Sequence, residues 1–131
     1  KKANEDLIKT TTSPVLGVGL GATYVLSAFG ARIKKTPVKK APIKASMKKP
    51  CPLLLDLKRF FSVVCASGYT VSDLPDNFDV AASSKESEFE IAQEIEKPFF
   101  AIRFNPEAGG DGKKIINNFA NFVEMWEKHH K

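Results

Sequence analysis

The stretch SPVLGVGLG at residues 13–21, followed directly by ATYVLSAFG at residues 22–30, decides the fold of this chain. The first part is an apolar run that enters a glycine-rich turn, and it predicts a β-strand. The second part predicts a helix that is closed by Gly30 at its C-terminus. A strand, a sharp turn and a helix form an elbow, which in enzymes holds one side chain out for nucleophilic attack.

Further stretches follow the elbow in a fixed order. Residues 74–84 (LPDNFDVAASS) and 89–95 (FEIAQEI) each predict a strand, and residues 97–107 read KPFFAIRFNPE. Together with the elbow they resemble the class I (triad-type) glutamine amidotransferases. The family patterns are P-x-L-G-I-C-x-G-x-Q for the elbow, L-P-x-G-F-x-V-x-A-x-S, and K-P-x-x-G-x-Q-F-H-P-E. The closing Gly112 to Phe119 resembles the family's ending, so the resemblance covers most of Pro14–Val123.

The resemblance implies an α/β fold, with a flavodoxin-like sheet of the class I glutamine amidotransferase kind and flanking helices. An elbow strand is normally central in such a sheet, with parallel neighbours on both sides. The family's opening βα units have no counterpart here, because residues 1–12 predict only a helix that leads into the elbow strand. One sheet edge is therefore expected to be bare. Upstream sequence beyond this chain, a partner that covers the edge, and a reduced fold all remain open explanations.

The resemblance also identifies positions for the catalytic triad. In the family a cysteine thiolate attacks the side-chain amide of glutamine, a histidine transfers the proton, and a glutamate orients the histidine. The positions that match are Gly19, Asn105 and Glu107. Glycine has no side chain and a carboxamide does not titrate near neutral pH, so neither can replace the family residue. Thr23 also replaces the glutamine that follows the elbow. We therefore expect a catalytically inactive site.

Other residues could in principle have taken over the chemistry. Cys65 lies in an apolar run, where a cysteine usually packs as a small hydrophobic residue. Cys51 lies between two prolines in a predicted loop, and His129 and His130 are at the C-terminal end. A rebuilt cysteine–histidine pair is therefore a minor alternative.

Length and composition set further limits. A chain of 131 residues, with 43% hydrophobic and 27% charged residues, predicts one globular domain over residues 1–131. The resemblance implies that this is only part of a glutamine amidotransferase domain. Two cysteines are too few for a disulfide scaffold and favour a reducing, intracellular compartment, either cytoplasmic or organellar. No apolar run has the length of a membrane span. We expect no cofactor and no metal.

Residues 32–50 are unusually basic and contain no acidic residue. Because the whole chain has a net charge of +5, its remaining part is net acidic. Several prolines exclude a regular helix here, so we predict a basic arm or loop. It is either a solvated connection or an arm that binds an acidic protein partner or RNA phosphates. Its basic residues are Arg32, Lys34, Lys35, Lys39, Lys40, Lys44, Lys48 and Lys49.

The C-terminal segment predicts a helix that begins near Gly112. Its apolar residues fall on one face, and we expect Ile115, Ile116, Phe119 and Phe122 to pack in the core. Trp126 lies further along, where it can contact a partner.

These observations lead to one expectation and two alternatives for function. The expectation is a catalytically inactive domain that acts as a structural or interaction subunit of a larger complex, such as a ribonucleoprotein. The first alternative is a working glutamine amidotransferase component that supplies ammonia to a synthetase. The second is a regulator that binds glutamine without hydrolysing it.

Overall fold

The computed structural model describes residues 13–36, 40–66, 68–85 and 87–129. Their elements, in chain order, are β1 (Val15–Val18), α2 (Leu20–Ala28), β2 (Arg32–Lys35), β3 (Ala41–Met47), the short 3-10 helix η1 (Pro52–Leu54), β4 (Phe60–Cys65), β5 (Tyr69–Asp73), β6 (Phe78–Ser83), β7 (Ile91–Glu94), β8 (Phe99–Ile102), β9 (Asn105–Gly110) and α3 (Gly112–His129).

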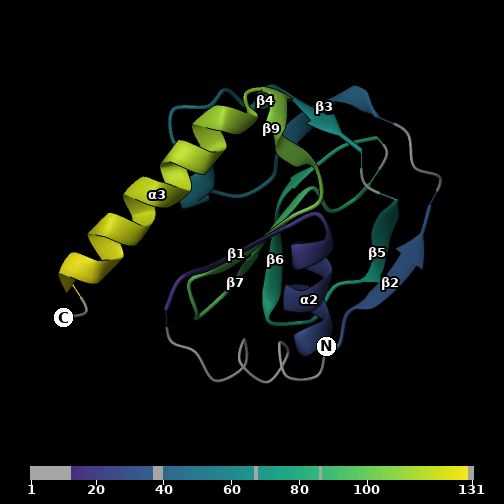
Figure 1. Ribbon diagram of the computed structural model, residues 1–131. Coiled ribbons are helices and arrows are strands. Elements are labelled where there is room, and N and C mark those ends of the chain that lie inside the picture. Colours follow the sequence, from purple (N-terminus) through teal and green to yellow (C-terminus); the bar gives the residue numbers. More distant parts are fainter. Residues whose placement is uncertain (1–12, 37–39, 67, 86, 130–131) are drawn as a thin grey trace.

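Seven of these strands form one sheet in the order β1-β8-β7-β6-β3-β4-β9, and β2 pairs with β5 in a separate two-stranded ribbon (Figure 1). β1 and β8 are parallel, with Val15 opposite Phe99. The other pairs within the sheet are antiparallel. The sequence predicts an α/β fold, and this mixed sheet with its helices confirms it. Within the described residues the elbow strand β1 ends the sheet, so it is not central.

The two faces of the sheet carry separate apolar cores. Because alternate residues of a strand point to opposite faces, β8 contributes Phe99 and Ala101 to one core and Phe100 and Ile102 to the other. Helix α2 packs on the first face through the buried Ala22, Val25 and Leu26, together with Phe78 and Phe89.

Helix α2 ends as the sequence predicts. Gly30 adopts a φ of 95°, a conformation that glycine reaches without strain. The N–H of Gly30 donates to the carbonyl of Ser27, and the N–H of Ala31 donates to that of Leu26. These bonds satisfy the last carbonyls of the helix and confirm Gly30 as its C-terminal cap.

Helix α3 lies over the second face and extends beyond the sheet toward the C-terminus (Figure 1). Ile115 is fully buried, and the Phe100 ring meets Phe119 and Phe122 edge-on at centroid distances of 6.1 and 5.3 Å. The helix and these packing positions match the prediction. Ile116 does not, because it is 37% exposed on the outer side of the helix.

The basic segment 32–50 differs from the predicted arm or loop. Arg32–Lys35 form β2, and Ala41–Met47 form β3, which lies inside the seven-stranded sheet and buries Ile43 and Ala45. Pro42 is tolerated because β6 pairs with β3 only at Ser46 and Met47, so the β6 side of Pro42 needs no N–H donor. The sparse apolar pattern misled the prediction, since only alternate side chains of β3 are buried.

Candidate functional site

The elbow between β1 and α2 is the centre of the candidate site. Gly19 has a φ of 58° and a ψ of −119°, and its N–H donates to the carbonyl of Ile102 over 3.0 Å. A Cβ built on Gly19 would have no heavy atom within 4 Å, whereas one on Gly17 would lie 2.6 Å from the carbonyl oxygen of Gly21. Gly17 is therefore required for close packing of the strand against the helix. Position 19 is sharply turned and faces open space.

A chain of hydrogen bonds holds the elbow from the side of β5 and β8. The hydroxyl of Tyr69 donates to the carbonyl of Gly19 over 2.9 Å. The carbonyl of Tyr69 in turn accepts from Nη1 of Arg103 over 3.2 Å. The conformation of the elbow is thus tied to a side chain that follows β8 directly.

Arg103 forms an ion pair with Glu90 in the interior. Their side chains are 6% and 0% exposed, and Nη2 of Arg103 lies 2.9 Å from Oε2 of Glu90. Nε of Arg103 lies 3.3 Å from both carboxylate oxygens. The hydroxyl of Ser84 also donates to Oε2 of Glu90 over 2.6 Å. A buried carboxylate with this many donors is fully compensated, and it fixes the guanidinium beneath the elbow.

Two pKa values in this cluster are displaced. Burial raises the pKa of the Tyr69 hydroxyl above its ordinary value, and the positive charge of Arg103 only partly offsets this. Burial alone would lower the pKa of Arg103, but the hydrogen bond and ion pair with Glu90 raise it. Tyr69 is therefore a neutral donor and Arg103 a permanent cation at neutral pH.

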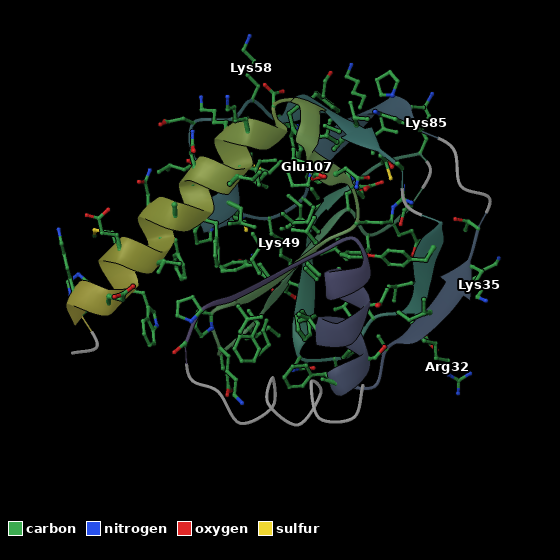
Figure 2. The ribbon with its side chains drawn as sticks, viewed as in Figure 1. Arg32, Lys35, Lys49, Lys58, Lys85 and Glu107 are labelled. Carbon is green, nitrogen blue, oxygen red and sulfur yellow. The ribbon has the colours of Figure 1, made fainter. Side chains whose placement is uncertain are left out.

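Asn105 and Glu107 both lie on β9, which follows β8 closely. The side-chain oxygen of Asn105 accepts from the N–H of Ala66 over 2.7 Å, so this carboxamide ties β9 to the end of β4. Glu107 is exposed (Figure 2). Gly19 binds Ile102, three residues before Asn105, so the elbow and the start of β9 lie in the same part of the fold. No proton-transfer group stands at Gly19 or Asn105.

The two thiols differ in their surroundings. Cys51 precedes η1, and burial raises the pKa of its thiol to about 11. Cys65 is buried at the end of β4, in the apolar core on the second face of the sheet. His129 ends helix α3, whose 18 residues extend roughly 27 Å from β9. Within the described residues the structure therefore forms no pair between His129 and Cys65, and His130 lies outside them.

The basic residues of segment 32–50 do not form one surface. Arg32, Lys34 and Lys35 lie on the β2 ribbon, where Arg32 is 3.9 Å from Asp73. The others lie on or beside β3: Lys40 before it, Lys44 on it, and Lys48 and Lys49 after it, and Lys49 pairs with Asp79 at 3.2 Å. Lys39 lies outside the described residues. Figure 2 shows Arg32 and Lys35 well apart from Lys49.

Trp126 is partly buried on α3. It lines a shallow groove together with Phe122, Phe100 and the turn between β7 and β8.

The polar cluster beneath the elbow was missed by sequence reasoning. Arg103 lies in the KPFFAIRFNPE stretch, and Glu90 stands between apolar residues of a predicted strand. A charged residue flanked by buried apolar ones is a signal for a buried ion pair, and it could have identified Glu90. Among the described residues no group of three or more histidine, cysteine, aspartate or glutamate side chains is arranged to hold a metal ion. No described helix has both the length and the apolar character needed to cross a membrane.

Comparison with known proteins identifies relatives for nearly the whole chain. Residues 2–124 match the family model described as glutamine amidotransferase class-I. The chain is 31% identical over 113 residues to a glutamine-hydrolyzing GMP synthase of Campylobacter jejuni, in a match that covers 84% of this chain and 22% of that protein. It is 28% identical over 117 residues to a glutamine-hydrolyzing GMP synthase subunit of Methanothermobacter thermautotrophicus, in a match that covers 87% of this chain and 63% of that protein.

Solved structures share the fold. The structure of a GMP synthase subunit from Thermoplasma acidophilum aligns with a TM-score of 0.90 at 23% identity, over 98% of this chain and 66% of that one. A glutamine amidotransferase of Thermotoga maritima aligns with a TM-score of 0.70 at 18% identity, over 96% and 54%. The chain thus spans less than two thirds of the length of the curated relatives named above, and about a quarter of a single-chain GMP synthase.

These comparisons correct the main functional expectation. A catalytically inactive structural or interaction subunit, in a ribonucleoprotein or another complex, is the wrong interpretation, because the curated relatives are described as glutamine-hydrolyzing GMP synthases. They favour the alternative of a glutamine-dependent component, and they give no support to RNA binding.

Proposed function

The chain belongs to the class I glutamine amidotransferase family, and from this premise we propose that it is the glutamine-using component of a GMP synthase-type enzyme. In this role it takes part in releasing ammonia from glutamine and passes the ammonia to a synthetase partner. The observation that carries the proposal is the family match over residues 2–124, together with the elbow geometry at Gly19.

The synthetase partner follows from the lengths of the relatives. Two of the relatives are described as GMP synthase subunits, and this chain covers 63% and 62% of them. The relatives described as GMP synthases rather than as subunits are much longer, because the match covers only 22% and 25% of two of them. We propose that the partner is an ammonia-using synthetase, either as a separate subunit or on a longer polypeptide.

The proposed reaction needs a nucleophile other than residue 19. A thiol would attack the amide carbon of glutamine, the C–N bond would break, and the thiol proton would leave with the nitrogen as ammonia. Water would then hydrolyse the thioester to glutamate and restore the thiol. Of the two described thiols we nominate Cys65, which directly precedes Ala66, the residue whose N–H donates to the side chain of Asn105. Cys51 is a poor candidate, because its raised pKa keeps it protonated.

The test uses the native protein with the partners and segments that accompany it in its own cells. Product formation by the synthetase is measured with glutamine and then with ammonium as the nitrogen source, and glutamate release is followed in parallel. We expect glutamine to support synthesis. Cys65→Ser should abolish glutamine-dependent but not ammonium-dependent synthesis, and the matched Cys51→Ser variant should keep both.

Each other outcome has a defined meaning. Full glutamine use by Cys65→Ser would exclude Cys65, and full use by the Cys51→Ser variant as well would exclude both thiols of this chain. Synthesis that runs on ammonium but never on glutamine would overturn the proposed function itself.

A further inference from the structure

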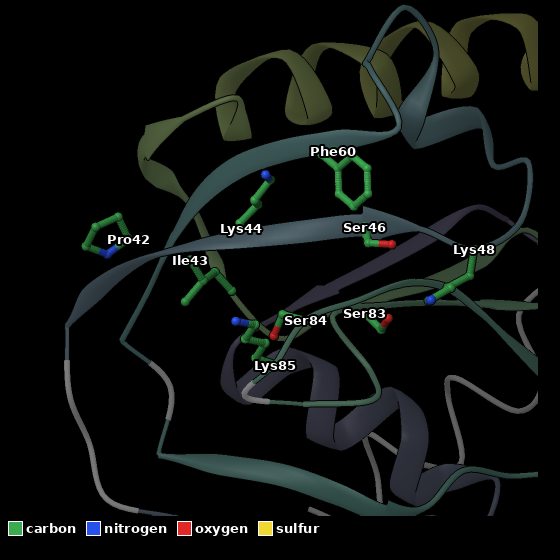
Figure 3. Close-up of a pocket in the computed structure, with 9 residues that line it drawn as sticks. All are labelled: Pro42, Ile43, Lys44, Ser46, Lys48, Phe60, Ser83, Ser84 and Lys85. Atoms are coloured by element: carbon green, nitrogen blue, oxygen red, sulfur yellow. The ribbon is translucent and has the colours of Figure 1, made fainter.

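A groove opens in the sheet at the point where β3 and β6 separate. The two strands pair only at Ser46 and Met47, opposite Ser83 and Ala82, and then diverge. The resulting groove has a volume of about 590 Å³, within the range of small-molecule sites (Figure 3). It is lined by Pro42, Ile43, Lys44, Ser46, Lys48, Phe60, Ser83, Ser84 and Lys85.

The polar lining of this groove is suited to an anion. Three lysines reach it from separate places: Lys44 from β3, Lys48 from the residue after β3, and Lys85 from the turn after β6. Hydroxyl groups of Ser46 and Ser83 lie between them (Figure 3). No acidic residue lines the groove among the described residues. Three cations around one hollow repel one another unless an anion lies between them.

The ion pairs of the molecule strengthen this argument. Lys49, next along the chain, is neutralised by Asp79 at 3.2 Å. Within the described residues, none of the three groove lysines has an acidic partner within 4.0 Å. Their charge is therefore left available to a ligand.

The backbone of β3 adds a hydrogen-bond donor on its edge that faces β6. The N–H of Met47 bonds to Arg59 on the β4 side, whereas the N–H of Lys48 bonds to Ala81 on the β6 side. Since successive N–H groups of a strand alternate between its two edges, the N–H of Lys44 points to the β6 edge. β6 does not pair with β3 at that position. The donor therefore faces the groove.

The groove also has an apolar wall. Phe60 is 53% exposed, and the amine of Lys44 lies 5.0 Å from the centre of its ring. Ile43 also borders the groove, but it is only 8% exposed and lies on the opposite side of β3 from Phe60 (Figure 3). A ligand that combines a charged group with an apolar body would contact both kinds of surface.

We propose that this groove binds a phosphate-bearing small molecule, with the phosphate held by Lys48, Lys85 and the hydroxyls of Ser46 and Ser83. Its remaining part lies along the exposed ring of Phe60. Tetrahedral phosphate oxygens accept from several donors at once, which suits a groove lined by lysines and hydroxyls from separate places along the chain. This binding does not depend on the proposed glutamine chemistry.

Isothermal titration calorimetry on the full chain tests the proposal. The probes are inorganic phosphate, pyrophosphate and a nucleoside monophosphate. The double variant Lys48→Ala/Lys85→Ala is compared with the matched control Lys34→Ala/Lys35→Ala, which removes the same charge from the β2 ribbon. Circular dichroism verifies that both variants are folded. We expect saturable binding of at least one probe, weaker at higher salt, and an affinity at least ~10-fold lower in the groove variant.

The arms of the experiment separate the sources of the phosphate. If the nucleotide binds most tightly of the three probes, the apolar side of the groove takes part in recognition. If all three probes bind equally, the site recognises the phosphate group alone. No binding of any probe at millimolar concentration would overturn the proposal. Equal weakening in the β2 control would also overturn it, because the binding would then be a general property of the basic surface.

Discussion

Removal of one partner from the buried Glu90–Arg103 pair should destabilise the protein strongly. Arg103→Met removes the guanidinium from a fully buried carboxylate, which keeps the hydroxyl of Ser84 as a donor. Glu90→Leu leaves a buried guanidinium that still donates to the carbonyl of Tyr69. An uncompensated buried charge costs about 3–5 kcal/mol. A domain of this size has roughly 5–15 kcal/mol of total stability, so each single variant should lose a large share of it.

The double variant Glu90→Leu/Arg103→Met should be much less affected. It replaces both charges with apolar side chains, so no buried charge is left unpaired. Ser84 and the Tyr69 carbonyl would each lose a partner, at a cost of about 1 kcal/mol each. We therefore expect a loss of about 2 kcal/mol, well below the sum of the single variants.

Urea titration at neutral pH, followed by circular dichroism, measures all four proteins. The difference between the double variant and the summed single variants gives the interaction energy. Single variants that lose less than about 1 kcal/mol would refute the reasoning, because water would then reach the pair. Strict additivity would refute it too, since the two side chains would not act as a unit.

Three further changes test the elbow and the thiols. Gly17→Ala would place a Cβ 2.6 Å from the carbonyl oxygen of Gly21. Urea titration should therefore show a loss of more than about 2 kcal/mol in the free energy of unfolding. A loss near zero would contradict the tight contact between strand and helix. Tyr69→Phe removes the 2.9 Å hydrogen bond to Gly19 and should cost about 1 kcal/mol, whereas an unchanged unfolding midpoint would show that the bond adds nothing. Because burial raises the pKa of Cys51 to about 11, alkylation of this thiol should be slow at neutral pH. The alkylation rate, measured by mass spectrometry, should rise about tenfold per pH unit up to that pKa. A plateau of the rate below pH 9 would contradict the burial of the thiol.

Local features of the fold were predictable from sequence. The apolar run and the glycines predicted β1, the turn and α2, and Gly30 was identified as the cap because a left-handed residue favours glycine. Helix α3 followed from its apolar periodicity. These features depend on neighbours within a few residues, so the sequence pattern contains the information.

Features that depend on distant contacts were not predictable. β3 has a basic, proline-containing sequence, and it is a strand because β4 pairs along it and its Ile43 and Ala45 are buried in the core. The cluster beneath the elbow joins Tyr69, Glu90 and Arg103, which are up to 34 residues apart. Single-sequence patterns do not report such pairings.

The candidate site shows the same division. The resemblance placed Gly19 in the elbow, and its φ of 58° forms the sharp turn that the sequence predicts there. It could not show that the hydroxyl of Tyr69 binds this turn. The functional interpretation was wrong because it weighed individual side chains above the family as a whole.

The most direct test of the proposed function is glutamate release from glutamine by the native protein in the presence of its synthetase partner. We expect glutamate to form in step with the synthetase product, and ammonium to replace glutamine. A synthetase that works with ammonium, while no glutamate forms from glutamine, would contradict it.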